Sequence, residues 1–225
     1  MNLKVVEKFV SINGEGVRAG QPAVFLRFAG CNLNCIFCDT KWANEADVSY
    51  ESESPEQLVE YVVATGITNV TLTGGEPLLQ EGIGDLIRQL LAVPQLQIEI
   101  ETNGSVDLSD FLAIRKGNQQ RLTVTMDYKL PFSQMEKHMK KNNFSLISRE
   151  DTVKFVVADE TDLAVAKKVI EDYGLISKTQ VYISPVFGEI ELTKIVDFLI
   201  ENKLNGVNMQ LQMHKFIWDP NQKGV

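Results

Sequence analysis

The sequence predicts an α/β fold with a mostly parallel sheet, contained in one domain. Two observations predict it. Apolar strand candidates alternate with helical patterns along most of the chain, and such alternation implies right-handed crossovers between parallel strands. The sequence also contains no linker or low-complexity segment that would separate two cores. We therefore expect a single domain over residues 1–225.

The predicted strands have one apolar and one polar face. In one of them Thr71 and Thr73 alternate with Val70 and Leu72, and alternate residues point to opposite faces of a sheet. Parallel strands covered on both faces are usually apolar throughout, so helices should cover only the apolar face. The polar face should line a wet or ligand-filled cavity, with an open, solvated sheet as the alternative. The strands are expected at residues 23–28, 69–73, 95–101, 121–130, 152–158, 180–187 and 207–216.

Helices are expected between these strands. Ser54 has the features of an N-cap, because Pro55 follows it and Gln57 completes a capping box, so a helix should run to about Ala64. Apolar residues at helical spacing predict the others. These cover residues 83–92, 163–173 and 192–199, with weaker candidates at 107–115 and 133–141.

Composition excludes several classes of function. The net charge of −8 argues against non-specific binding to nucleic acid or to an anionic membrane. No apolar run has transmembrane length, and the first residues do not resemble a signal peptide. Unpaired cysteines without an export signal indicate a reducing cytoplasm.

The cysteines are the most informative residues. Cys31, Cys35 and Cys38 are the only three in the chain, at C-x3-C-x2-C spacing. Three thiolates on one loop can hold three corners of a cubane iron–sulfur cluster and leave one iron open to a ligand. The alternatives are a zinc site, which needs a fourth ligand such as His138 or His214, and a redox-active C-x-x-C pair.

Other loops should lie beside the cysteines. The strand around Thr73 runs into Gly74-Gly75-Glu76-Pro77, and the strand ending at Glu101 runs into Thr102-Asn103-Gly104. The cysteine loop also follows a strand, and parallel α/β folds bind ligands at the carboxyl ends of strands. The two glycines allow close backbone approach to a ligand, and Glu76 could pair with a ligand ammonium.

The three cysteines followed by Gly-Gly-Glu-Pro resemble the radical S-adenosylmethionine (SAM) enzymes. The stretch 11–16, the run 20–31, Cys38-Asp39-Thr40 and the segment 211–216 are similar to the 7-carboxy-7-deazaguanine synthase (QueE) family, most specifically in residues 9–40 and 70–80. The resemblance implies a partial (β/α)6-type radical SAM barrel with missing or shortened helices. It also implies three cofactors: a 4Fe-4S cluster, SAM and Mg²⁺.

The resemblance also implies roles for individual residues. The cluster ligands would be Cys31, Cys35 and Cys38, and Mg²⁺ would bind Thr40. The substrate would contact Ile12, Asn13, Gly14, Arg27 and Thr73. SAM would contact Phe37, Asp39, Gly75, Glu76, Asp127, Tyr128, Lys129, Ser184, Pro185, Val186 and Phe187.

The implied reaction is a radical SAM lyase step toward queuosine and related 7-deazapurines. It converts 6-carboxy-5,6,7,8-tetrahydropterin to 7-carboxy-7-deazaguanine with loss of ammonia, after a 5′-deoxyadenosyl radical takes hydrogen from C6. Arg27, on the first of the predicted strands, suits the substrate carboxylate because its planar fork can bind bidentately. The implied partners are the small pterin substrate, a flavodoxin- or ferredoxin-type reductant and a second copy of the chain in a homodimer.

The sequence departs from the family at three places. Asp127-Tyr128-Lys129 replaces the usual Ser-Pro-Lys, Asn13 replaces a glutamine, and the chain continues after His214-Lys215 to Val225. Two rival functions stay open at this stage. One is a glycyl-radical-enzyme activase, and the other is a non-catalytic iron–sulfur or zinc protein.

Overall fold

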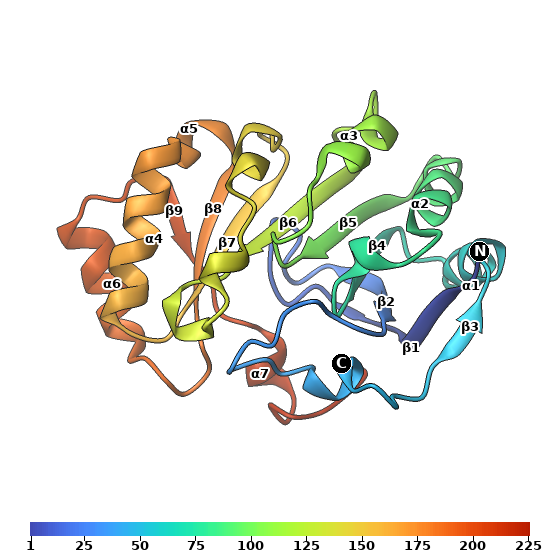
Figure 1. Ribbon diagram of the computed structural model, residues 1–225, viewed down its shortest axis with the longest axis horizontal. Helices are drawn as coiled ribbons and strands as arrows, with labels where there is room; N and C mark the ends of the chain where they lie inside the picture. The colour runs from blue at the N-terminus through green and yellow to red at the C-terminus, as the bar shows by residue number, and fades with distance from the viewer.

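A computed structural model describes residues 1–225, with the side chain of Leu112 excepted. The chain forms a mixed α/β fold on one sheet (Figure 1). The strands among these residues are β1 (Leu3–Ile12), β2 (Pro22–Phe28), β3 (Glu51–Glu53), β4 (Asn69–Gly74), β5 (Gln97–Thr102), β6 (Leu122–Tyr128), β7 (Thr152–Val157), β8 (Gln180–Pro185) and β9 (Val207–Met209).

The helices fall into two kinds. The α-helices of the described residues are α1 (Pro55–Thr65), α2 (Ile83–Leu91), α3 (Ser109–Arg115), α4 (Glu160–Tyr173), α5 (Leu175–Lys178), α6 (Leu192–Glu201) and α7 (His214–Ile217). The 3-10 helices are η1 (Lys41–Asn44), η2 (Pro77–Leu79), η3 (Pro131–Ser133), η4 (Glu136–His138) and η5 (Lys141–Ser145). Among the described residues no helix combines the length and the apolar character needed to cross a membrane.

The sheet is open, and its strand order is β3-β1-β2-β4-β5-β6-β7-β8-β9. Neighbouring strands from β2 to β9 are parallel, whereas β1 pairs antiparallel with both β2 and β3. The two edges do not pair with each other among the described residues. The predicted partial barrel is therefore confirmed, and it is short of an α-helix between β6 and β7.

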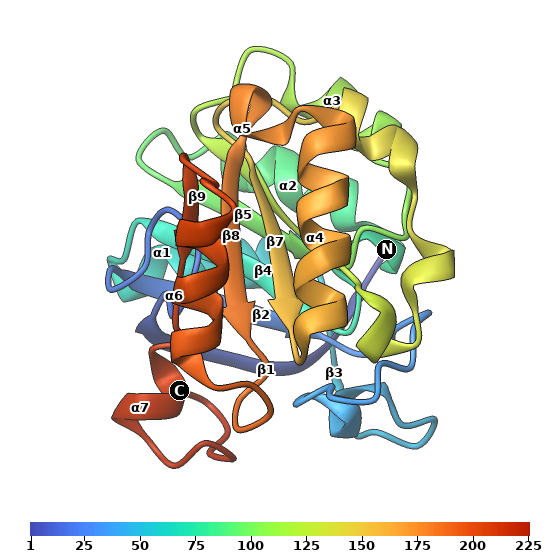
Figure 2. The same ribbon diagram turned by 90° about the vertical axis from the view of Figure 1, so that its left-hand side faces the viewer.

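Helices cover only the outer face of the curved sheet, as α4 and α6 do over β7 and β8 (Figure 2). That face carries the apolar core, including Val153, Phe155 and Ile183. The predicted capping box at the start of α1 is also confirmed. The Ser54 side chain accepts from the Gln57 N–H, and the Gln57 side chain accepts from the Ser54 N–H. The apolar half of each strand pattern thus predicted the helix-covered face correctly.

The inner face of the sheet is polar and largely removed from solvent. Thr71, Glu99, Thr125 and Lys154 are each at most 9% exposed. The prediction that the polar face lines an interior space is therefore confirmed, and the alternative of a solvated open sheet is wrong. Inside this half-barrel each polar side chain depends on partners from the protein or from a ligand.

Two predicted elements need correction. The helix expected at 133–141 is a series of 3-10 turns, because Gln134 has a φ of 64° and ends η3, and Met139 is extended and ends η4. The strand expected at 207–216 stops at Met209. Beyond it the chain bonds the β1–β2 loop instead, where the Gln210 side chain accepts from the Gly16 N–H at 2.7 Å.

The β1–β2 loop fills one end of the half-barrel. Arg18 donates to the Thr123 hydroxyl at 3.3 Å and lies 3.9 Å from the carboxylate of Glu99. Glu99 also accepts a short hydrogen bond from Thr125. Burial, reinforced by the nearby charge of Glu101, raises the pKa of Glu99 to about 7. The loop is thereby fixed in a position that directs Gly14 and Glu15 toward the interior.

The raised pKa of Glu99 predicts a pH dependence of stability. The pKa of this carboxyl rises from 4.5 to about 7 on folding, so the folded chain holds a proton that the unfolded chain has lost. The contribution of Glu99 to the free energy of unfolding therefore falls as the pH rises from 4.5 to about 7. Glu99→Gln should remove that dependence and gain about 1 to 3 kcal/mol relative to the parent between pH 5 and pH 8.

The measurement is denaturant unfolding of both proteins across this pH range. Glu81→Gln, a change at a solvent-exposed carboxyl, is the matched control and should follow the parent profile. Parallel profiles for Glu99→Gln and the parent would contradict the account of Glu99.

Candidate functional site

The Gly74-Gly75-Glu76-Pro77 loop packs directly against the start of the cysteine loop. The N–H of Gly75 donates to the Phe28 carbonyl at 3.1 Å, and that of Glu76 donates to the Gly30 carbonyl at 2.9 Å. A Cβ on Gly75 would lie 1.9 Å from the Gly30 oxygen, and Gly74 has a φ of 128°. Only glycine fits both positions, so these residues set the distance between the two loops.

Glu76 connects this loop to the loop after β5. It is fully buried and accepts from three donors: the Leu78 N–H at 3.1 Å, the Thr102 hydroxyl at 2.9 Å and the Asn103 N–H at 2.7 Å. Burial raises the pKa of its carboxyl. The expected pairing of the Glu76 side chain with a ligand ammonium is therefore not supported, because the carboxylate bonds to the protein and does not line the cavity.

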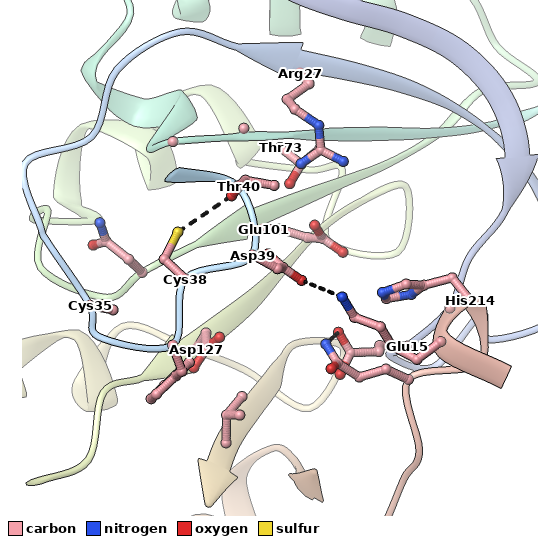
Figure 3. A pocket seen from close by; sticks show the side chains of 18 of the residues that line it. Glu15, Arg27, Cys35, Cys38, Asp39, Thr40, Thr73, Glu101, Asp127 and His214 are labelled. Atoms are coloured by element: carbon pink, nitrogen blue, oxygen red, sulfur yellow. Dashed lines mark hydrogen bonds and ion pairs between the residues drawn. The ribbon is translucent and has the colours of Figure 1, made fainter. Parts of the chain in front are cut away.

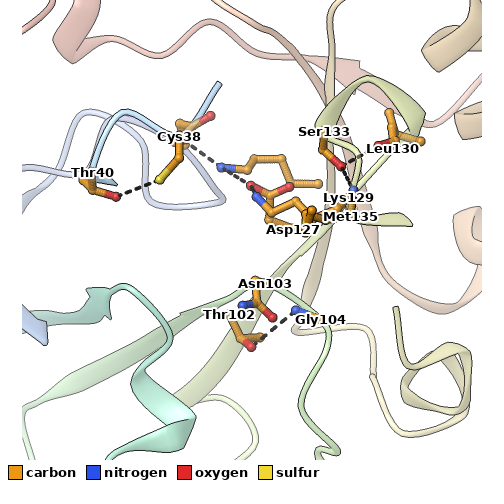
Figure 4. Close-up of polar contacts among 12 residues, drawn as sticks. Cys38, Thr40, Thr102, Asn103, Gly104, Asp127, Lys129, Leu130, Ser133 and Met135 are labelled. Carbon is orange, nitrogen blue, oxygen red and sulfur yellow. Dashed lines mark hydrogen bonds and ion pairs between the residues drawn. The ribbon is translucent and has the colours of Figure 1, made fainter. Parts of the chain in front are cut away.

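Asn103 in turn contacts the cysteine loop. Its side-chain amide donates to the Cys31 sulfur at 3.5 Å and to the Asn32 side chain at 3.0 Å. Figure 4 shows Thr102 and Asn103 at the end of β5, with Cys38 and Thr40 on the cysteine loop. The three loops that follow β2, β4 and β5 therefore meet at one rim, as the sequence predicted.

The three cysteines line one cavity. Cys35 is buried, whereas Cys31 and Cys38 are partly exposed. Burial raises the pKa of Cys31 and raises that of Cys35 to about 11, so thiolates here need cationic ligands such as iron. Among the described residues no three His, Cys, Asp or Glu side chains are arranged to hold a single metal ion.

The cavity has a volume of about 690 Å³ and extends from the cysteine loop across the inner face of the sheet. In Figure 3, Cys38 and Thr40 lie on one side, Glu15 and His214 lie opposite, and Arg27 and Thr73 come from the neighbouring strands. The sequence-predicted site residues that line it are Ile12, Gly14, Arg27, Cys31, Cys35, Phe37, Cys38, Asp39, Thr40, Thr73, Gly75, Asp127, Lys129, Val186 and Phe187.

Other predicted site residues do not line the cavity. Tyr128 lies on the helix-covered face, where its ring packs against Phe144 and Phe155 at centroid distances of 5.6 and 5.7 Å. Asn13 is buried and accepts from the Thr71 hydroxyl at 2.8 Å. The Tyr128 side chain therefore faces away from the expected SAM site. The substrate contact expected of Asn13 stays a prediction, because its buried side-chain NH₂ group has no partner among the described residues. Ser184 and Pro185 are also buried away from the cavity.

Several polar cavity residues had no role assigned from the sequence, and five of them bear on the chemistry of the site. These five are Glu15, Glu101, Lys154, Gln212 and His214. Glu101, Gln212 and His214 belong to the alternating polar pattern, which indicated a cavity wall without giving roles. Lys154 had a different signal, because it is the single charged residue of β7, where four of the other five residues are apolar.

Charges cross the cavity in a chain of ion pairs. Lys154 lies 2.9 Å from Glu15 and 3.6 Å from Asp127, and Lys129 lies 2.9 Å from Asp127. Burial alone would raise the pKa of Asp127, but the two lysines hold it below its usual value. Burial likewise opposes the charge of Lys154, yet the surrounding carboxylates raise its pKa. Asp127 and Lys154 are thus both ionised at neutral pH.

The Arg27 side chain is oriented by Glu7 on the neighbouring strand. Glu7 and Arg27 are paired across β1 and β2, and the arginine Nε donates to the glutamate at 3.0 Å. The guanidinium also lies 6.0 Å from the ring of Phe9, which stacks on Phe25. Using Nε for this bond leaves the two terminal nitrogens of Arg27 available to a ligand.

The cavity residues fit the implied cofactor set. Glu15, Asn44 and Asp127 each have a buried side-chain oxygen that lacks a hydrogen-bond partner among the described residues. Buried polar atoms of this kind are rarely left unpaired. SAM and a pterin are both rich in N–H and O–H donors that can satisfy such oxygens, and the three cysteines supply thiolates for a cluster.

Comparisons with known proteins agree with this geometry. Residues 26–147 match the sequence profile of the radical SAM superfamily. A 7-carboxy-7-deazaguanine synthase from Clostridium acetobutylicum is 55% identical over 225 residues, covering 100% of both chains. Another from Chlorobaculum tepidum is 35% identical and covers 99% of this chain and 97% of its own. These relatives favour neither an activase nor a non-catalytic metal protein.

Solved structures share the fold. The crystal structure of QueE from Escherichia coli has a TM-score of 0.69 at 21% identity, with 95% of each chain covered. The structure of histidine-tagged anSMEcpe with bound AdoMet (SAM) has a TM-score of 0.51 at 17% identity, covering 83% of this chain and 62% of that chain. On its sequence profile and its full-length relatives, the chain belongs to the radical SAM superfamily and, within it, to the 7-carboxy-7-deazaguanine synthase family.

Proposed function

We propose that the chain converts 6-carboxy-5,6,7,8-tetrahydropterin to 7-carboxy-7-deazaguanine with release of ammonia. One observation carries the proposal: a single cavity joins the three cysteines to an arginine and to unpartnered carboxylate oxygens. The cysteine side can hold a cluster and SAM, and the opposite side can hold a small molecule that bears a carboxylate and several N–H donors. The pterin substrate has both of these features.

The cysteine side would hold the cofactors. Cys31, Cys35 and Cys38 would ligate the 4Fe-4S cluster, and SAM would lie against the nearby cavity residues Phe37, Asp39, Gly75, Asp127, Lys129, Val186 and Phe187. When bound and reduced, the cluster and SAM together supply a carbon-centred radical that takes hydrogen from the substrate. The protein's part is to hold the substrate against that centre and to exclude water.

The opposite side would hold the pterin. The terminal nitrogens of Arg27 suit the substrate carboxylate, and Glu7 keeps the guanidinium plane fixed before binding. Gly14, Ile12 and Thr73 would contact the ring, and Glu101 and Glu15 supply acceptors for its N–H groups. Anchoring at two ends sets the reacting carbon within reach of the cofactor side, which is the main contribution that positioning makes to rate.

Mg²⁺ would bind at Thr40. Its hydroxyl lines the cavity and lies 3.6 Å from the Cys38 sulfur, between the cysteine side and the substrate side. A hard cation prefers oxygen ligands and keeps several waters, so one hydroxyl together with substrate oxygens is a suitable ligand set.

Four further proposals come from the family. Residues 1–225 would act as one radical SAM domain, which the continuous sheet supports. A flavodoxin- or ferredoxin-type reductant would approach the cysteine loop, where Ile36 is 50% exposed. The chain would work as a homodimer in the cytoplasm.

The test is anaerobic turnover. The reconstituted chain, given SAM, a reductant, Mg²⁺ and the carboxypterin, should produce 7-carboxy-7-deazaguanine and ammonia. Arg27→Lys keeps the charge but loses the planar fork, so it should lower kcat/KM by about 10- to 1000-fold. SAM cleavage without substrate should survive, because the cysteine and glycine loops are unchanged.

Arg88→Lys is the matched control, since Arg88 pairs with Asp85 on the exposed surface, and it should turn over normally. Absence of the deazaguanine from the parent reaction would contradict the proposed function. Normal turnover by Arg27→Lys, or its loss of SAM cleavage as well, would contradict the carboxylate-binding role alone.

A separate prediction concerns the metal. Thr40→Ala removes one hard ligand without changing a thiolate, so cluster content and SAM affinity should stay at parental values while the Mg²⁺ response of turnover weakens. Thr40→Ser keeps the hydroxyl and should restore the response. The measurement is a Mg²⁺ titration of turnover, and identical titrations for Thr40→Ala and the parent would show that Thr40 does not bind the metal.

A further inference from the structure

Lys154 occupies a position that the reaction described above does not explain. It lies in the middle of β7, is 9% exposed, and is the single charged residue of that strand. A buried lysine is costly unless it is paired. Its ammonium group bonds to Glu15 at 2.9 Å and lies 3.6 Å from Asp127. It therefore connects the β1–β2 loop to the end of β6 across the cavity.

The two carboxylates that Lys154 holds have the same unusual arrangement. Glu15 uses Oε2 for Lys154 and for the side-chain amide of Gln212 at 3.3 Å. Asp127 uses Oδ2 for Lys154 and for Lys129. The second oxygen of each carboxylate, Oε1 of Glu15 and Oδ1 of Asp127, is buried without a partner among the described residues.

The two free oxygens belong to different parts of the cavity. Asp127 is on the cofactor side, because its partner Lys129 lies 5.8 Å from the ring of Phe37 on the cysteine loop. Glu15 is on the substrate side, directly after Gly14, and its partner Gln212 comes from the segment before α7. One ammonium group thus fixes one acceptor in each of the two ligand positions.

We propose that Lys154 is a positioning residue that orients Glu15 and Asp127 together, so that Glu15 Oε1 accepts from the pterin and Asp127 Oδ1 accepts from a hydroxyl or ammonium group of SAM. The inference rests on the proposed function and deepens it, because it explains how the two ligands are placed relative to each other. It also gives the free oxygen of Asp127 a specific role on the cofactor side.

The proposal predicts different effects for Lys154, which bridges the two carboxylates, and for the carboxylates of Glu15 and Asp127 themselves. Without the ammonium of Lys154, two buried carboxylates lose a shared partner and both acceptors lose their fixed direction. Replacing one carboxylate by its amide has a local effect instead. The amide oxygen turns toward the lysine, and the NH₂ group then faces the cavity, so an acceptor becomes a donor.

The experiment measures binding on the anaerobically reconstituted chain without reductant, so that no turnover occurs. Calorimetry gives Kd for SAM, and then Kd for the carboxypterin with SAM bound. Lys154→Gln should weaken both affinities by about 10- to 100-fold, the range expected for hydrogen bonds to charged groups. Glu15→Gln should weaken only the pterin, and Asp127→Asn should weaken SAM while the pterin, measured at saturating SAM, keeps its affinity.

Two further variants act as controls. Lys129→Gln removes a partner of Asp127 that does not touch Glu15, so it should weaken SAM alone. Lys154→Arg keeps the positive charge and should recover part of both affinities. If Lys154 had a purely structural role, Lys154→Gln would lower the melting temperature. The Glu15 and Asp127 variants would then not show their separate losses of pterin affinity and SAM affinity.

The inference is overturned if Lys154→Gln weakens only one ligand or neither. If Lys154→Gln does not fold, Glu15→Gln and Asp127→Asn decide the question with the bridge intact, and unchanged affinities in either variant would overturn it. A parent chain that binds SAM but not the carboxypterin would contradict the proposed function instead. In that case the SAM affinities of the Lys154 and Asp127 variants still test the bridge.

Discussion

The inner face of the sheet holds charged side chains away from water, and the site depends on how those charges are paired. Glu15, Asp127, Lys129 and Lys154 form one connected set across the half-barrel. Burying any one of them alone would cost several kcal/mol, because the lost hydration has no compensation. Paired, they keep the cavity polar and leave selected oxygens free for ligands.

A second constraint is the close packing of three loops at the rim. Gly74 and Gly75 let the loop after β4 lie on the backbone that precedes Cys31, and Glu76 fastens it to the loop after β5. The cysteines are consequently held by neighbours on both sides before any cluster binds. Preorganisation of this kind reduces the ordering cost of binding a cofactor. The loops of the rim and the charges of the sheet thus divide the cavity into a cofactor side and a substrate side.

Much of this could be predicted from the sequence, because it depends on local patterns. The cysteine spacing, the glycine pair and the alternation of Thr71 to Thr73 are readable within a few residues. What could not be predicted depends on contacts between distant segments. Strand β1 was missed because its place in the sheet comes from antiparallel pairing with β2 and β3. The strand expected at 207–216 ended early because Gln210 bonds to Gly16, 194 positions away.

The same distinction holds within the site. Tyr128 follows a pocket residue in sequence, but the pleat of β6 turns it to the opposite face. Glu76 was expected to face a ligand, yet Thr102 and Asn103 take its oxygens, and their nearness to Glu76 could not be read from the sequence. Lys154 was overlooked because its partners lie 139 and 27 positions away along the chain.

The central claim is that Cys31, Cys35 and Cys38 hold a cluster with an iron open to SAM. The most direct measurement is iron and acid-labile sulfide analysis after anaerobic reconstitution, followed by spectroscopy of the reduced protein with and without SAM. The account predicts about four irons and four sulfides per chain and a spectrum that changes when SAM is added. Stoichiometric zinc without sulfide, or a cluster whose spectrum is indifferent to SAM, would contradict it.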